Sequence, residues 1–200
     1  MTSILTGDII NSRDVDSQIW LPILKSALNK YGTTPKKWEI YRGDSFQLEV
    51  EPTEALLAAI HLKSSIKQTT TLDIRLGIGI GKKDHTTSKI TEANGEAFIN
   101  SGQAFDQLNN KKTMALVTPS SNLNQQMELA LDLALLTMNA WPANAAKYIR
   151  TSIEHPDWKQ NELAKHLGKS QGTISQSLNR AGFDDIMKLE KRYRELLTNL

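Results

Sequence analysis

Hydrophobic and polar positions along the chain follow two periods, one typical of strands and one typical of helices. Alternation with period two predicts a hairpin at 38–50 with Gly43-Asp44 at its turn, and short apolar runs predict strands at 3–10, at 72–81, which finishes in glycines, and at 113–119. Helical spacing predicts helices at 17–31 and 53–67, with Ser17 and Thr53 as N-caps, and a loop followed by a helix at 91–108.

The order of these elements predicts the fold class of the first 119 residues. Strand, helix, strand, strand, helix, strand is the order of a split βαβ, or ferredoxin-like, α+β arrangement. In that arrangement the first strand lies beside the hairpin, which places Asp8, near the end of the strand, next to Asp44 at the hairpin turn. Asp8 alone is compatible with a helix or loop cap and Asp44 alone with a turn residue. Together they are compatible with a metal site.

After Pro119 the pattern becomes helical. A polar linker, "SSNLNQQ", precedes a helix at 127–141 that is apolar on most sides and is therefore either buried or dimer-forming. Residues 183–197 predict an amphipathic last helix that packs or dimerises. We expect three parts: a palm-like domain at 1–119, a linker and connecting helix at 120–142, and an all-α helix-turn-helix domain at 143–200.

Residues 158–183 carry the helix-turn-helix pattern. Ala164 stands where two helices pass closely, Gly168 where the turn needs a positive φ, and Ile174 where the second helix is buried against the first. The second helix is expected to present polar side chains that bond base edges and phosphates, with Lys169 reaching the backbone. The expected DNA-binding residues are Lys169, Gln171, Thr173, Ser175, Gln176, Asn179 and Arg180. A small helical bundle used for protein contact remains the alternative.

Composition and charge change this picture little. The chain of 200 residues has no cysteine, which excludes disulfides and thiolate zinc sites and fits a reducing cytoplasm. No apolar run is long enough to span a bilayer and no secretory signal is expected, so we expect a cytoplasmic protein without membrane contact. Residues 140–200 hold 10 Lys and Arg against 7 Asp and Glu, a mildly basic balance that suits a polyanion.

The front part resembles a known family. The motifs "GDIINSR", "RGDSFQ", "RLGIGIG" and "NGEAF" resemble the SatD family and, more distantly, the palm-like catalytic domain of class III nucleotidyl cyclases. The resemblance covers about residues 3–118 and does not include the tail. It implies a palm-like domain fused to a helix-turn-helix.

The resemblance also implies roles for individual residues. Asp8 and Asp44 match the two aspartates that hold two divalent cations, Mg²⁺ or Mn²⁺, on the phosphates of a nucleotide. The backbone amides of Ile9 to Ser12, Asn11 included, would open the first helix and meet phosphate, with Arg42 or Arg13 adding positive charge. Gly77, Gly79 and Gly81 would let a ligand or a partner backbone approach closely.

The late helix departs from the cyclase pattern. The cyclases need an asparagine and an arginine there, whereas this chain offers Asn100 slightly out of register and Gly102 where a basic residue is expected. Loss of a transition-state cation costs a phosphoryl-transfer enzyme about 10³–10⁵ in rate. The resemblance therefore favours binding over turnover.

Three hypotheses follow. The first is a homodimeric, cytoplasmic DNA-binding transcriptional regulator whose palm-like domain senses a ligand, such as a nucleotide with Mg²⁺. The second is a metal-dependent nucleotidyl cyclase or nucleotidyltransferase with the helix-turn-helix as an accessory domain. The third is a scaffold in which the palm-like domain only dimerises.

Overall fold

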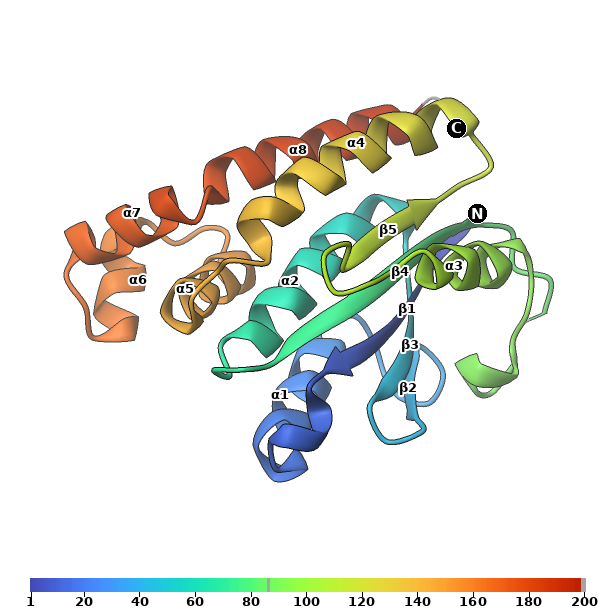
Figure 1. Cartoon of the computed structure of the whole chain (residues 1–200), viewed down its shortest axis with the longest axis horizontal. Helices are drawn as coiled ribbons and strands as arrows, with labels where there is room; N and C mark the ends of the chain where they lie inside the picture. The colour runs from blue at the N-terminus through green and yellow to red at the C-terminus, as the bar shows by residue number, and fades with distance from the viewer. Residues whose placement is uncertain (86, 199–200) are drawn as a thin grey trace.

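The computed structural model describes residues 1–85 and 87–198, and this part of the chain is an α+β protein built on one five-stranded mixed sheet (Figure 1). The strands are β1 Thr2–Ile10, β2 Trp38–Tyr41, β3 Ser45–Val50, β4 Asp73–Gly81 and β5 Met114–Val117. Their order in the sheet is β2-β3-β1-β4-β5. Neighbours are antiparallel except β4 and β5, which are parallel. The expected pairing of the first strand with the hairpin is confirmed.

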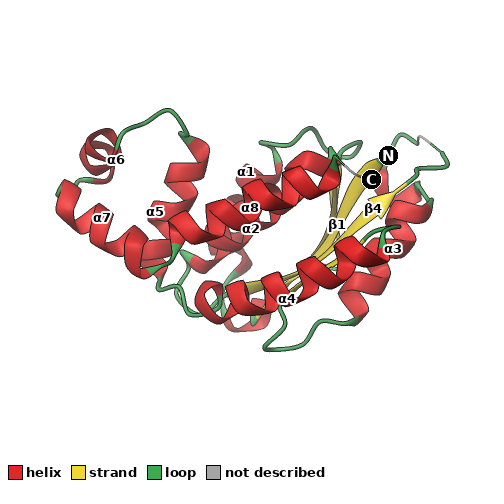
Figure 2. Ribbon diagram, turned by 90° about the horizontal axis from the view of Figure 1, so that it is seen from above, coloured by secondary structure: helices red, strands yellow, loops and turns green. Residues whose placement is uncertain are grey.

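Helices cover both faces of the sheet and also form the tail. The described helices are α1 Ser17–Leu28, α2 Ala55–Lys67, α3 Glu96–Asp106, α4 Ser121–Met138, α5 Ala143–Glu154, α6 Gln160–Leu167, α7 Gln171–Arg180 and α8 Phe183–Leu197. Seen from above, α3 lies on one side of the sheet and α1, α2 and α8 lie on the other (Figure 2). In this part of the chain, no helix combines the length and the apolar character needed to cross a lipid bilayer.

Side chains along β1 alternate between the two faces, as the pleat requires. Leu5 and Ile9 point into the main core with α1 and α2, and both are buried. Thr6 points to the opposite face, where its Oγ1 lies 3.0 Å from Ser101 Oγ on α3. Asp8 is two residues from Thr6 and points to the same face, so its carboxylate lies on the α3 side of the sheet.

The glycines of β4 allow α3 to pack directly on the strand. A Cβ on Gly79 would overlap backbone atoms of Ser101 and Ala97, and a Cβ on Gly77 would come within 2.6 Å of the Ser101 carbonyl. Of the two partners expected for these glycines, a ligand or a backbone, the structure therefore supplies a backbone, that of α3.

The helical tail packs on the front part through a continuous hydrophobic core. One cluster of buried side chains includes Ile60 of α2, Ile149 of α5 and Ile174 of α7. The last helix, α8, returns along α4 and docks on the front part, where Tyr193 Oη donates a hydrogen bond of 2.6 Å to the carbonyl of Pro52. The expectation that the last helix packs is therefore met.

Three local predictions are wrong, and they concern the N-caps of α1 and α2 and the linker after Pro119. The N-cap of α1 is Asp16, whose Oδ1 accepts a 2.9 Å bond from Gln18 N, and not Ser17. Thr53 lies inside a 3-10 turn, Pro52–Glu54, and does not cap α2. The expected linker after Pro119 is helical from Ser121 onward, because its polar residues occupy the exposed side of α4 while Leu123 faces inward.

Candidate functional site

The first candidate site lies where β1 ends beside β3 and β4. The register places Asp8 opposite Ser45 of β3 and opposite Arg75 of β4. Asp44 comes directly before Ser45 in the turn that joins β2 to β3. The sheet therefore brings the two predicted aspartates to one region.

Arg75 is the residue that engages Asp8. Its Nε donates to Asp8 Oδ1 at 2.8 Å and its Nη2 to Asp8 Oδ2 at 2.5 Å, a bidentate pair. These bonds, and in addition the charge of Asp44, raise the pKa of the Arg75 guanidinium above its usual value. The guanidinium carbon also lies 5.8 Å from the centre of the Phe105 ring on α3. Sequence analysis missed this role, although Arg75 opens the "RLGIGIG" motif.

Asp44 is held by a different partner. Ser12 Oγ donates to Asp44 Oδ2 at 2.5 Å, which joins the segment after β1 to the hairpin turn. The turn is tight: Arg42 and Gly43 have φ values of 52° and 89°. Of the predicted nucleotide-binding residues, Ser12 is therefore the one whose side chain contacts an aspartate.

The expectation that Ile9 to Ser12 open the first helix is wrong. β1 continues to Ile10, Asn11 has a left-handed φ of 62°, a 3-10 turn follows at Ser12–Asp14, and α1 begins only at Ser17. Ile9 is buried on the core face, away from Asp8. Asn11 donates from Nδ2 to the Thr71 carbonyl at 3.1 Å. Arg42 is exposed on the hairpin turn.

The donor atoms of this region suit a hard divalent cation that is shared with a ligand. Asp8, Asp44 and the Ser12 hydroxyl offer oxygen atoms, and Mg²⁺ is commonly held by one or two carboxylates with phosphate and water completing the shell. Within residues 1–85 and 87–198, three or more His, Asp or Glu side chains do not gather into a metal-binding group. A cation here would therefore need oxygens from its ligand, and Arg75 would have to release Asp8.

The late helix does not contribute a cation to this region. Asn100 Nδ2 donates to the Ile80 carbonyl at 2.7 Å, so its amide fastens α3 to β4. Gly102 faces open space, with no heavy atom within 4 Å of a Cβ built on it. Arg75, reaching across from β4, is the basic side chain placed against the α3 surface.

The second candidate site is the pair α6 and α7. Gly168 takes a left-handed φ of 63° at the end of α6, and Lys169 N bonds back to the Ala164 carbonyl at 2.9 Å. Ser170 caps α7 by accepting from Thr173 N at 3.2 Å. Ala164 and Ile174 are buried between the helices. The predicted roles of the alanine, the glycine and the isoleucine are therefore met in the local geometry.

The outer surface of α7 is polar, as expected. Exposed side chains are Gln171, Thr173, Gln176, Asn179 and Arg180, with Lys169 exposed just before the helix and Ser175 half-buried. Gln171 Nε2 donates to Gln160 Oε1 at 3.0 Å, which ties the start of α7 to the start of α6. Ile174 and Leu178 are buried on the opposite side of α7, so the polar side is the one that faces solvent.

The end of α7 is joined to the segment that follows α4. Trp141 is buried after α4, and its Nε1 donates to the Ala181 carbonyl, at the end of α7, at 2.9 Å. Thr173, Gln176 and Arg180 of α7 line a hollow of about 510 Å³ whose other wall includes Leu136 and Trp141.

A buried chain of hydrogen bonds connects the front part to α5. Because a carboxylate can only accept, His61 Nε2 donates to Glu154 Oε1 at 3.1 Å, and Tyr31 Oη lies within hydrogen-bonding distance, 3.0 Å, of His61 Nδ1. Arg150 Nε also donates to Glu154 Oε1, at 3.0 Å. The hydrogen bond from His61, with the bond and charge of Arg150, lowers the pKa of Glu154 to about 2 despite its burial.

Comparisons with protein-family models, with curated proteins and with solved structures found no match to this chain. Its function is therefore inferred from its own residues.

Proposed function

We propose that this protein is a homodimeric DNA-binding transcriptional regulator, in which a ferredoxin-like, palm-like front domain senses a nucleotide together with Mg²⁺ or Mn²⁺. The proposal takes residues 143–200 as the helix-turn-helix domain and the cytoplasm as its location. The likeness of the front motifs to class III nucleotidyl cyclases, whose matching aspartates hold divalent cations on a nucleotide, supports the sensing role.

The observation that carries the proposal is the geometry of α6 and α7. Two short helices meet at a left-handed Gly168, and the second is capped, buried on one side and polar on the other. That arrangement is the one with which helix-turn-helix proteins place a recognition helix in the major groove. Glutamine, asparagine and arginine are the side chains that read base edges there, and Arg180 and Gln176 lie on the exposed side of α7.

Selection of genomic fragments on the immobilised protein, followed by titration of the best fragment, tests the DNA-binding role. Gln176→Ala with Arg180→Ala should weaken binding by roughly 10- to 100-fold and relax the sequence preference at the bases that these side chains contact. A matched control, Gln103→Ala with Arg192→Ala, removes the same side-chain types from exposed positions elsewhere and should leave binding unchanged. Failure of the wild-type chain to bind any fragment at moderate salt would overturn the proposal.

The sensing role depends on Asp8 and Asp44. Their convergence beside Ser12 and Arg75 supports a site in which a cation takes the carboxylates and a phosphate takes the guanidinium. The test mixes the chain with each nucleoside triphosphate and Mg²⁺ or Mn²⁺, then separates bound ligand and products by chromatography and mass spectrometry. Retention of unaltered nucleotide that Asp44→Asn abolishes supports a sensor. No retention with any nucleotide argues against it.

The same convergence favours a second candidate, a metal-dependent nucleotidyl cyclase or nucleotidyltransferase. Two carboxylates and an arginine at one strand end are the groups that such chemistry uses. Conversion of a nucleotide in the same mixture, lost in Asp44→Asn, would support the enzyme. The lack of a basic side chain on α3 is why we place it second. If Asp8→Ala and Asp44→Ala leave every activity unchanged, the front domain is a scaffold.

A further inference from the structure

The outer face of α4 carries an apolar stripe. Leu129, Leu133 and Leu136 are 66%, 60% and 75% exposed. Among the residues that the structure describes, six large hydrophobic side chains are exposed, and these three share one helix face. Their clustering distinguishes this face from the isolated apolar residues that any surface carries.

The spacing of the stripe is that of a helix-pairing seam. Steps of four and three residues alternate along it, as in a heptad repeat, and all its members are exposed. The seam consists of Asn122, Gln126, Leu129, Leu133, Leu136 and Ala140. The opposite side of α4 is buried in the protein through residues such as Leu131 and Leu135. The helix is therefore already ordered, and a partner would not have to supply the free energy for folding it.

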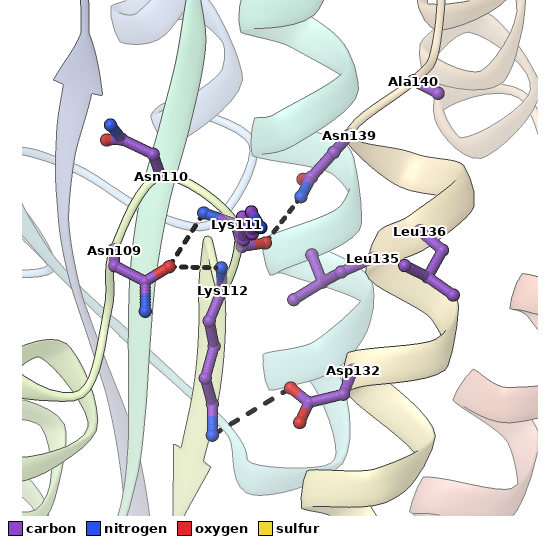
Figure 3. A pocket seen from close by; sticks show the side chains of 9 residues that line it. All are labelled: Asn109, Asn110, Lys111, Lys112, Asp132, Leu135, Leu136, Asn139 and Ala140. Carbon is purple, nitrogen blue, oxygen red and sulfur yellow. Dashed lines mark hydrogen bonds and ion pairs between the residues drawn. The ribbon is translucent and has the colours of Figure 1, made fainter.

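Hollows flank the end of this stripe on both sides. Leu136 and Ala140 line the hollow next to α7 and also a hollow of about 640 Å³ next to the turn before β5 (Figure 3). In the second hollow, Asn139 Nδ2 donates to the Lys111 carbonyl at 2.7 Å, so the end of α4 is fastened to that turn. A ridge between two hollows is the shape that accepts the side chains of another helix.

The partner that fits this surface is a second copy of the chain. In an antiparallel pair of α4 helices centred on Leu133, Leu133 meets its own copy and Leu129 meets Leu136 of the other copy, so the leucine positions coincide. Farther out, Gln126 meets Ala140, which follows the end of α4. The charged residues of α4 are Glu128 and Asp132, and Lys112 of the same chain lies 2.8 Å and 4.0 Å from their carboxylates. That lysine offsets the repulsion between acidic residues brought together by a twofold axis. The absence of Lys and Arg from α4 disfavours an anionic membrane as the occupant.

We propose that the leucine face of α4 forms the homodimer interface, with the two helices antiparallel about Leu133. This proposal rests on the homodimer of the proposed function and assigns that dimer a surface and a register. The interface does not depend on DNA binding. Because Trp141 ties the end of α4 to the end of α7, the interface would also fix the separation of the two recognition helices.

Sedimentation or light scattering without DNA tests the interface. The wild-type chain should show twice its mass of 22.4 kDa, and Leu133→Glu should reduce this to the monomer mass without loss of helical signal, because Leu133 is exposed. The control is Ile99→Glu, an equally exposed aliphatic residue on α3, which should remain dimeric. A wild-type monomer at every concentration, or a Leu133→Glu dimer as stable as wild type, would overturn the proposal.

Cysteine cross-linking tests the register, since the chain has no native cysteine. Leu133→Cys should form a disulfide-linked dimer under oxidation because the two copies meet at the axis. Asn122→Cys, on the same helix face, should not, since an antiparallel arrangement separates the two copies of that position by roughly 33 Å. Cross-linking through Asn122→Cys would instead indicate parallel helices and refute the register. A folded Leu133→Glu monomer that still binds a DNA half-site would separate failure of dimerisation from failure of DNA recognition.

Discussion

Replacement of Glu154 by glutamine should weaken the attachment of the helical tail to the front part and so lower the free energy of unfolding of the chain. Glu154 accepts hydrogen bonds from His61 and Arg150, and these hold its pKa at about 2 against an ordinary 4.5. At about 1.4 kcal/mol per pH unit, this difference corresponds to about 3 kcal/mol of folding stability. A glutamine keeps an acceptor oxygen of similar shape, so we expect Glu154→Gln to lower the free energy of unfolding by about 2 kcal/mol at neutral pH.

The lowered pKa of Glu154 also predicts the direction in which its contribution to stability changes with pH. The pKa of Glu154 is lower in the folded than in the unfolded chain, so its contribution is complete above pH about 4.5 and declines as the pH falls toward about 2. Urea unfolding, followed by tryptophan fluorescence from neutral pH down to pH about 3, should show the stability difference between wild type and variant shrinking with acid.

The control for this series is Glu195→Gln, which removes a surface partner of Arg192 and should change stability by less than about 0.5 kcal/mol at every pH. A Glu154→Gln variant that matches this control, or a stability difference that stays constant with pH, would refute the reasoning from the lowered pKa.

Two further predictions concern packing. Gly79→Ala should lower the free energy of unfolding by about 3 kcal/mol because the added methyl group would overlap the α3 backbone. Gly102→Ala should raise it by about 1 kcal/mol because the added methyl group faces open space and alanine favours a helix. Thermal unfolding curves of the two variants, each compared with wild type, should show shifts of opposite sign. Tyr193→Phe should cost about 1 kcal/mol through loss of the bond to Pro52, measured by urea unfolding, and an unchanged midpoint would mean that this bond does not anchor α8.

Much of the secondary structure could be predicted because each element has an amphipathic face. α8 was expected at 183–197 and found there, since its apolar residues recur at helical spacing over its whole length. The start of α4 was missed because residues 121–126 are polar except for Leu123, which faces inward. Local composition cannot distinguish such a polar helix turn from a linker.

The strand-end site was only partly predictable. Topology alone placed Asp8 near Asp44, because pairing of the first strand with the hairpin follows from the order of elements. The partner of Asp8 was missed because Arg75 faces it through the β1–β4 register, which the order of elements does not specify. Ile9 was misplaced for a different reason: alternation along β1 sends it to the face opposite Asp8, and the strand continues past it.

The shared core of sheet and tail has a consequence for modularity. Because α2 packs on α5, and Tyr193 of α8 reaches Pro52, a cut between residues 119 and 143 would strip apolar surface from both fragments. Neither fragment is expected to fold well alone, and the whole chain should melt in one cooperative transition. The position of α7 therefore depends on its packing, through α5 and α8, against the front part. A change at the strand ends would reach α7 through shifts in packed contacts, without the swing of a flexible tether.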